Sequence, residues 1–187
     1  MTFSELKTRE HEVQSLYLGS FRSPAIPRPN ISHDREENPM ATLRFTTDIP
    51  VDVDTAWGVL DRYTRAESRL FDETRPVRMV TVTEAGGAHA PARYRVVTYD
   101  GIDVYELDVS IEPDLGRLLY TIPGFGGAVH HQAEIRVVAL DDASTRVTWT
   151  TDVYPASFLD LYPAELYEAN FREMARSLAK GDMNSTV

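Results

Sequence analysis

Two adjacent histidines, His130 and His131, are the side chains of this sequence best suited to proton transfer near neutral pH. In the strand-like segment that they open, His131 alternates with Ala133, Ile135 and Val137, whereas His130 falls on the other face. We therefore expect His131 to point inward, where its imidazole could act as a general acid or base. A lone histidine on an apolar face is more often a hydrogen-bonded core residue, and the pattern leaves both interpretations open.

Two further polar side chains are candidates for catalysis beside His131. Tyr105 alternates with apolar neighbours on a strand-like segment and could donate a hydrogen bond to a carbonyl, or simply pack with its hydroxyl satisfied. Asn170 borders the apolar stripe of a helical segment near the C-terminus. Arg95 could anchor an anionic oxygen if its face of the strand is internal; we expect it instead to be an ordinary surface charge.

The remaining site candidates are mostly apolar or aromatic residues expected to line a ligand cavity. Such residues are more often core than ligand-contacting, although one residue can serve both purposes. The predicted ligand-binding residues are Trp57, Tyr99, Leu107, Phe125, Ile135, Trp149, Thr151, Tyr167, Phe171 and Met174.

Several kinds of chemistry have no support in the sequence. There is no cysteine, and the five histidines form no HxxxH or HExxH pair, so we expect no metal site. Nucleotide-binding and nucleophile-elbow motifs such as GxGxxG and GxSxG are absent, so we expect no cofactor. The glycine-rich loop Gly124–Gly127 joins two strand-like segments rather than opening a helix, which argues against a phosphate cradle.

Composition narrows the class of partner. The chain has 187 residues, of which 42% are hydrophobic, and a formal net charge of -10. An acidic chain is repelled by phosphate backbones and anionic membranes, so we expect neither nucleic acid nor membrane as a partner. No apolar run approaches the roughly 20 residues of a membrane span, and no secretory signal is visible, so we expect a cytoplasmic protein.

The pattern divides the chain into an arm, one domain and a short tail. Residues 1–40 combine weak helical spacing with four prolines between residues 24 and 39, which predicts a partly ordered arm. A sharper interpretation packs a short helix of this arm over the cavity mouth or onto a second protomer in a homodimer. Residues 41–181 form the predicted ligand-binding domain, and residues 182–187 form the tail.

The predicted domain begins with one strand and ends with one long helix. Alternation predicts the first strand over 41–49, and Asp52 or Asp54 can cap a following helix. We place a second short helix over residues 66–71. Six strand-like segments follow, separated by short turn signals that make sequential strands antiparallel neighbours: Val77–Glu84, Arg93–Asp100, Ile102–Glu112, Arg117–Ile122, Val129–Leu140 and Thr145–Tyr154.

The last element is a helix, and its start fixes where a site would lie. Tyr167, Phe171, Met174 and Leu178 recur at helical spacing, and Gly181 provides a stop signal. Because consecutive turns of a meander alternate between two ends, the turn at residues 100–101, the 124–127 loop and the junction before this helix share one end.

This order of elements, with the segments IPVDVDTAWGVLDRY and TRVTWTTDVYP, resembles the START-like (SRPBCC) superfamily over roughly residues 41–180. Polyketide cyclase/dehydratase members are the nearest comparison. The resemblance implies an α+β helix-grip fold, in which a curved antiparallel sheet of about seven strands wraps a long C-terminal helix. It also implies an apolar cavity between them, with its mouth at the glycine-loop end, where Phe125 could cover a ligand.

Two function classes follow from this resemblance. One is a cofactor-independent enzyme that binds an aromatic or polyketide-like molecule and promotes cyclisation, dehydration or a related proton transfer. The alternative is a non-catalytic carrier of a hydrophobic small molecule with the same cavity, and a third is an interaction protein assembled through the arm. The acid/base candidates favour the enzyme; the sequence does not identify the ligand.

Overall fold

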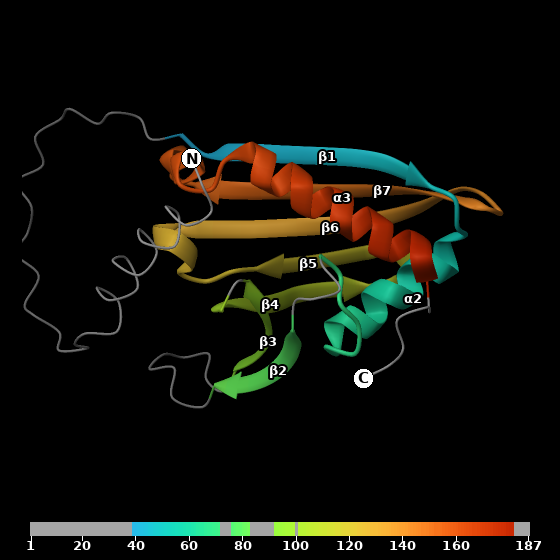
Figure 1. Ribbon diagram of the computed structural model, residues 1–187, viewed down its shortest axis with the longest axis horizontal. Helices are drawn as coiled ribbons and strands as arrows, with labels where there is room; N and C mark the ends of the chain where they lie inside the picture. The colour runs from blue at the N-terminus through green and yellow to red at the C-terminus, as the bar shows by residue number, and fades with distance from the viewer. Residues whose placement is uncertain (1–38, 72–75, 83–91, 100, 182–187) are drawn as a thin grey trace, which may run out of the picture. The chain divides into compact units, whose positions relative to one another are not determined.

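The computed structural model describes residues 39–71, 76–82, 92–99 and 101–181. These residues form a seven-stranded antiparallel sheet in the order β1-β7-β6-β5-β4-β3-β2 (Figure 1). The predicted meander is confirmed, and the first strand closes it by pairing with the last. The strands are β1 (Ala41–Ile49), β2 (Val77–Val82), β3 (Ala92–Tyr99), β4 (Ile102–Glu112), β5 (Arg117–Thr121), β6 (His130–Asp141) and β7 (Ser144–Tyr154).

Two α-helices pack on one face of this sheet, which confirms the predicted helix-grip arrangement (Figure 1). Helix α3 (Ala164–Lys180) crosses the β1–β7–β6 side, and its C-terminal part meets α2 (Val53–Thr64). The three short 3-10 turns are η1 (Pro113–Leu115), η2 (Phe125–Gly127) and η3 (Ala156–Asp160). Neither α-helix of the described residues is long and apolar enough to cross a membrane.

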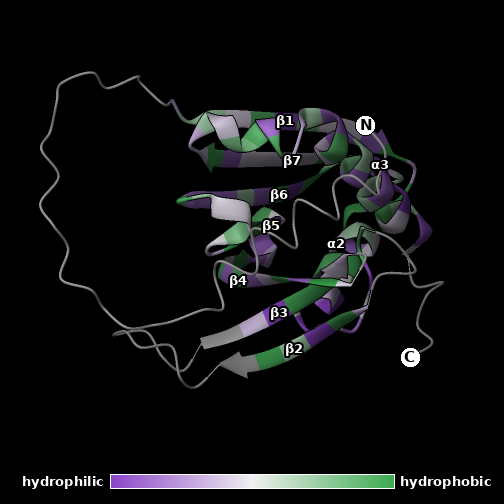
Figure 2. Cartoon of the chain, turned by 60° about the vertical axis from the view of Figure 1, so that its left-hand side comes forward, coloured by the Kyte–Doolittle hydropathy of each residue, from purple (hydrophilic) through white to green (hydrophobic). Residues whose placement is uncertain are grey.

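The core lies between the helices and the inner face of the sheet. The predicted α3 stripe is confirmed, since Tyr167, Phe171, Met174 and Leu178 are all buried. They pack with inner-face residues such as Ile135 of β6. Each large apolar side chain buried in this way contributes about 1.5–3 kcal/mol to folding. Helix α3 and the strands carry both hydrophilic and hydrophobic residues, as expected for elements that bury one face (Figure 2).

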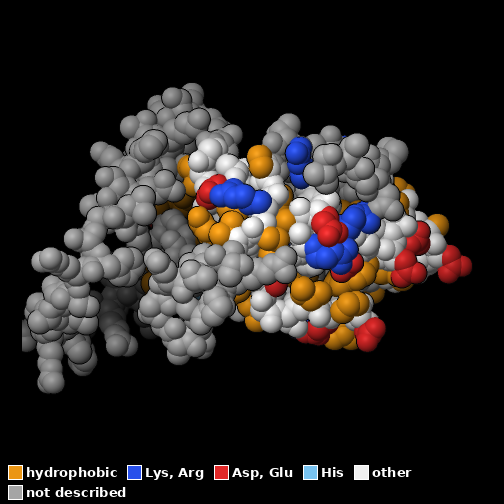
Figure 3. Space-filling view, turned by 90° about the horizontal axis from the view of Figure 1, so that it is seen from below, with side chains coloured by type: hydrophobic (Ala, Val, Ile, Leu, Met, Phe, Trp, Pro, Cys, Tyr) orange, Lys and Arg blue, Asp and Glu red, His pale blue; other side chains and the backbone are white. Residues whose placement is uncertain are grey.

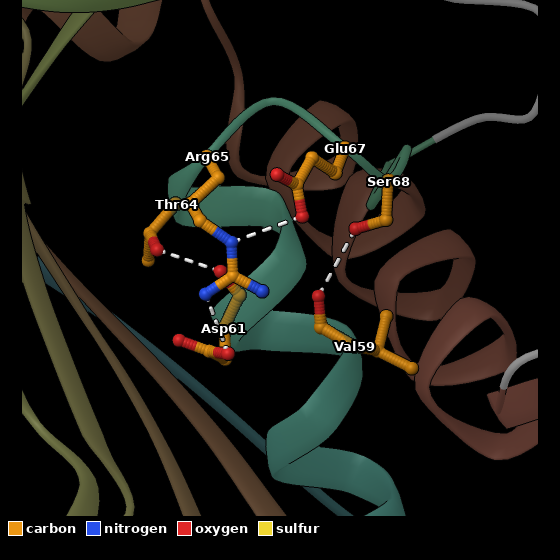
Figure 4. Close-up of polar contacts among 6 residues, drawn as sticks. All are labelled: Val59, Asp61, Thr64, Arg65, Glu67 and Ser68. Atoms are coloured by element: carbon orange, nitrogen blue, oxygen red, sulfur yellow. Dashed lines mark hydrogen bonds and ion pairs between the residues drawn. The ribbon is translucent and has the colours of Figure 1, made fainter. Parts of the chain in front are cut away.

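Helix α2 has defined caps at both ends. Asp52 caps its N-terminus, as predicted, by accepting a hydrogen bond from the Thr55 backbone N–H at 2.7 Å. At the other end, Arg65 reaches back to Asp61 and forward to Glu67, and the Ser68 hydroxyl donates to the Val59 carbonyl (Figure 4).

The prediction of a second short helix over residues 66–71 is wrong, because these residues form turns and bends. Ala66 takes a left-handed φ of 59°, which ends the helical path. The backbone N–H groups of Arg65 and Glu67 both bond the Arg62 carbonyl, so α2 ends in a cap rather than continuing.

The predicted common end of the sheet is confirmed by strand register. His130 at the start of β6 faces Tyr154 at the end of β7, and Tyr99 faces Ile102 across the 100–101 turn. The strand predicted to begin at Val129 begins at His130 instead. Val129 precedes it and is exposed, with its N–H bonded to the Tyr154 carbonyl.

Several exposed charges on the surface form ion pairs. Arg78 pairs with Asp103, and Arg146 pairs with Asp48. On the face shown in Figure 3, basic side chains lie beside acidic ones, with apolar side chains between these patches. Such exposed pairs contribute little to stability. The predicted arm, except its last two residues, and the predicted tail lie outside the described residues.

Candidate functional site

His131 stands on the inner face of β6, as predicted, and its side chain is buried. Its backbone carbonyl is held by two donors on the preceding strand, the Ile122 N–H at 3.0 Å and the Thr121 hydroxyl at 2.7 Å. These two hydrogen bonds fix the backbone of His131, and with it the start of the side chain, at the end of the sheet that also holds the glycine-rich loop and the start of α3.

The imidazole of His131 meets the Tyr167 hydroxyl of α3. His131 Nε2 lies 3.0 Å from Tyr167 Oη, and the two rings stack. Burial lowers the pKa of His131 to about 4, because a charged imidazole is poorly solvated there, and its own backbone opposes this only in part. Burial raises the pKa of the Tyr167 hydroxyl well above its ordinary value. Both groups are therefore uncharged near neutral pH.

Aromatic side chains cover this pair at the end of the sheet. The rings of Phe125 and Phe158 each lie 6.0 Å from the imidazole in edge-on contact. Tyr162 joins them, with ring centroids 4.8 Å from Phe125 and 4.7 Å from Phe158. Gly126 allows this close approach: its φ is 54°, and a Cβ would lie 2.5 Å from the Tyr162 ring. Phe125 therefore packs against His131, and its covering of a ligand stays a prediction.

Three buried polar atoms on β6 and β7 have no hydrogen bond of normal geometry among the described residues. They are His131 Nδ1, Thr151 Oγ1 and Trp149 Nε1. Thr151 lies opposite Ala133, the next inner-face residue after His131, and Trp149 lies opposite Ile135. The three atoms therefore follow one stretch of the inner face below α3. An unpaired buried polar group costs about 1–3 kcal/mol, so a hydrogen bond from a water or a ligand atom would stabilise this part of the inner face.

The low pKa of His131 predicts that the folded protein becomes less stable as the pH falls. The unfolded chain binds a proton at this residue near pH 6.5 and the folded chain only near pH 4, so the unfolded state gains protons first as pH falls. We expect wild type to lose about 3 kcal/mol through His131 between these values. Urea unfolding at several pH values measures how the free energy of unfolding depends on pH. This dependence should be weaker in His131→Leu than in wild type and unchanged in His130→Ala. Equal slopes in wild type and His131→Leu would contradict the assignment.

A second polar cluster lies farther along the inner face and contains a buried charge. Arg95 of β3 contacts two carboxylates of β4, with Nε 2.9 Å from Glu106 Oε2 and Nη1 2.9 Å from Asp108 Oδ2. Its guanidinium carbon lies 4.1 Å above the Tyr63 ring and 5.8 Å from the Tyr120 ring. The Tyr63 hydroxyl donates to Glu106 Oε2 at 2.9 Å.

The electrostatics of this cluster are dominated by burial. Burial raises the pKa values of Glu106 and Asp108, and Arg95 offsets this only in part. Burial also acts to lower the pKa of Arg95, but Glu106, Tyr63 and Asp108 outweigh it and the pKa is raised. The cluster therefore retains a firmly cationic guanidinium between two acidic groups that hold protons more tightly than usual.

The structure corrects the predicted facing of β3 and β4. Tyr105 was expected to point inward but is 40% exposed, and Leu107 belongs to the same outer side of β4. The inner face of β4 carries Glu106 and Asp108 instead, since Glu106 lies opposite the buried Arg95. Arg95, expected at the surface, is accordingly internal. A β-bulge between Asp108 and Ser110 then shifts the alternation along this strand.

The other predicted site residues fall inside or beside the core. Asn170 is half-buried on α3, next to Phe171. Trp57 and Tyr99 are half-buried and pack against the core cluster. Buried members are Ile135, Trp149, Thr151, Tyr167, Phe171 and Met174. His131, Tyr167, Phe125 and Thr151 are brought together at one end, whereas Tyr105 is separated from them.

Apart from Arg95, sequence reasoning did not single out the residues of the second cluster as functional, nor the covering aromatics Phe158 and Tyr162. The helical spacing after residue 52 predicts only a packing position for Tyr63, and no local pattern marks Tyr120, Glu106 or Asp108 as functional. Among the described residues, no group of three or more His, Asp or Glu side chains could hold a metal ion.

Residues 40–185 match the family described as polyketide cyclase / dehydrase and lipid transport. No curated protein sequence matches the chain.

Solved structures share the fold at low sequence identity. The Zhui aromatase/cyclase of a Streptomyces species aligns with a TM-score of 0.55 and 17% identity, covering 75% of this chain and 92% of that one. Norcoclaurine synthase from Thalictrum flavum, in complex with dopamine and hydroxybenzaldehyde, aligns with a TM-score of 0.55 and 11% identity, covering 84% and 95%. The protein XoxI from Bacillus cereus gives 0.57 and 15%, covering 75% and 94%. These likenesses establish the fold.

Proposed function

Since the chain belongs to the polyketide cyclase/dehydrase and lipid transport family, we propose that it binds an aromatic or polyketide-like molecule against the inner face of its sheet and promotes a cofactor-independent proton transfer. The ligand lies beneath α3, near His131 and Tyr167. Cyclisation and dehydration are the reaction types that such a proton transfer serves.

One observation carries this proposal: the buried polar atoms His131 Nδ1 and Thr151 Oγ1, which have no hydrogen bond of normal geometry in the part of the chain that the structure describes. A protein interior rarely leaves such groups without partners, because each costs about as much as a lost hydrogen bond. Surrounded by aromatic rings, they suit a flat apolar ligand that carries a few oxygen atoms. The family relationship supports the same ligand class, and the norcoclaurine synthase structure holds two aromatic molecules on the same fold.

The pair His131–Tyr167 suggests how a proton would move. The Tyr167 hydroxyl can accept a hydrogen bond from the Nε2–H of His131, and in that tautomer Nδ1 carries a lone pair. Nδ1 then takes a proton from the carbon beside a ligand carbonyl, and the carbonyl becomes an enolate. The hydroxyl of Thr151 or the indole N–H of Trp149 donates a hydrogen bond to the enolate oxygen. In a dehydration, His131 returns the proton to the departing hydroxyl group, which leaves as water.

A carrier remains the second candidate, and the pKa of His131 favours it. A general base works best when its pKa lies near the working pH, and burial lowers this one to about 4. In a carrier the same unpaired atoms only anchor the ligand. Asn170, proposed from the sequence as a third catalytic group, is kept as a contact that would orient the ligand from α3.

Replacing Thr151 tests whether the unpaired atoms bind a ligand. We expect Thr151→Val to weaken binding of an aromatic ketone such as α-tetralone about fivefold to tenfold, the value of one hydrogen bond. Thr148→Val is the matched control, because Thr148 lies on the same strand and contacts Thr46 on the exposed side. Binding is measured by isothermal titration calorimetry.

Native mass spectrometry of freshly purified protein provides a test that needs no chosen ligand. We expect a small molecule that leaves the protein on denaturation. A protein that carries no molecule after expression and binds no aromatic ketone would overturn the proposed function.

A further inference from the structure

We propose that Arg95 and Asp108 form a second ligand-contact centre, which holds an uncharged hydroxyl group at the far end of the same elongated ligand. This inference rests on the proposed function, since it assigns one end of the ligand bound beneath α3. The inference adds a hydroxyl group to the description of the ligand, which the residues around His131 do not specify.

One buried donor and one buried acceptor of this cluster lack a hydrogen bond of normal geometry to any residue that the structure describes. Arg95 Nη2 lies 2.8 Å from Glu106 Oε2, and Asp108 Oδ1 lies 2.9 Å from Arg95 Nη1, as ion-pair contacts. Neither atom makes a hydrogen bond of normal geometry among the described residues. A hydroxyl can accept from the guanidinium N–H and donate to the carboxylate oxygen at the same time, whereas an ether or a ketone can only accept.

The charge of the cluster favours an uncharged ligand group. One guanidinium faces two carboxyl groups, and the other groups packed against it, Tyr63 and Tyr120, are neutral phenols with pKa values raised by burial. A carboxylate or phosphate on the ligand would therefore meet two acidic groups at close range in a poorly solvated place. An uncharged hydroxyl avoids this repulsion and offers both atoms a hydrogen bond in addition to their ion-pair contacts.

The cluster and Thr151 lie at opposite ends of one row of residues across the inner face. Across the inner face Asp108 lies opposite Tyr120, Tyr120 lies opposite Ala133, and Ala133 lies opposite Thr151. Neighbouring strands are about 4.8 Å apart, so this row spans about 14 Å along the sheet. At the two ends of the row lie Asp108 Oδ1 and Thr151 Oγ1, neither of which has a hydrogen bond of normal geometry among the described residues. A ligand that meets both ends is long and narrow, with oxygen functions at its two ends and apolar rings between them.

A pair of probes that differ only in a methyl group on the same oxygen isolates the hydrogen-bond donor of the ligand hydroxyl. β-Naphthol can donate and accept, whereas β-methoxynaphthalene can only accept. We expect wild type to bind β-naphthol about tenfold more tightly by isothermal titration calorimetry. Asp108→Ala should remove most of this difference without weakening β-methoxynaphthalene, and it should improve binding of β-naphthoate because one acidic group is gone.

The control for this variant lies on the same strand. Asp103 pairs with Arg78 at the surface, so Asp103→Ala should leave the affinities for both probes as in wild type. Circular dichroism checks that Asp108→Ala is folded, which we expect because Arg95 keeps Glu106 as its partner. If Asp108→Ala does not fold, Asp108→Asn keeps the shape and should still bind β-naphthol more weakly than wild type.

The outcomes separate this inference from the proposed function. Equal binding of the two probes by wild type, or an equal loss of both in Asp108→Ala, would overturn the hydroxyl centre and leave the proposed function standing. If wild type binds neither of these probes nor an aromatic ketone, both proposals are wrong.

Discussion

Replacing Arg95 with methionine is expected to lower the free energy of unfolding by about 3–5 kcal/mol, the largest single loss of stability predicted for this chain. The variant removes the cation that faces Glu106 and Asp108, while both carboxyl groups remain in place. Only the Tyr63 hydroxyl then donates to Glu106 in the described contacts. Methionine also loses the stacking of the guanidinium over the Tyr63 ring.

An exposed pair on the same part of the sheet provides the control. Arg78 pairs with Asp103, but both side chains are partly solvated, so Arg78→Met should cost less than about 1 kcal/mol. Urea unfolding followed by circular dichroism measures both variants. Adding Glu106→Gln and Asp108→Asn to Arg95→Met should recover most of the loss, because no buried acid then lacks a partner. Similar losses for Arg95→Met and Arg78→Met would contradict a buried ion cluster.

The Arg95–Glu106 contact could have been predicted from the sequence. A two-residue turn at Asp100-Gly101 fixes the register of its hairpin, and that register places residue 95 opposite residue 106, as the structure shows. The apolar alternation of Tyr105 and Leu107 predicted the opposite facing. It failed because the buried side of β4 carries acidic residues whose partner lies on the neighbouring strand, so hydrophobicity indicated the wrong face.

Other parts of the site depend on information that local patterns do not contain. Alternation placed His131 correctly, and helical spacing placed Tyr167 correctly. Their contact joins residues 36 positions apart and depends on how α3 crosses the sheet. The ring cluster of Phe125, Phe158 and Tyr162 likewise requires two irregular turns to meet. The order of elements could therefore be predicted, whereas the partners of each side chain came from tertiary packing.

Removing the imidazole of His131 should abolish most of the proposed catalysis. For an aromatic ketone such as α-tetralone, we expect wild type to accelerate exchange of the proton beside the carbonyl for deuterium, followed by NMR. His131→Ala should slow this exchange by about 10²–10⁴-fold, the usual contribution of a general acid or base. Tyr167→Phe, which removes the hydroxyl 3.0 Å from Nε2, should have a smaller effect, because Nδ1 remains available. His130→Ala is the control, since His130 faces away.

The pH dependence and the binding data decide between catalyst and carrier. The exchange rate of wild type should fall as pH drops through about 4, because protonation of His131 removes the lone pair that takes the proton. A structural role for His131 would change stability but would not impose this profile on the rate. If wild type binds α-tetralone and yet exchanges its proton no faster than buffer does, the catalytic assignment is wrong. The buried atoms His131 Nδ1 and Thr151 Oγ1 would then be the anchors of a carrier.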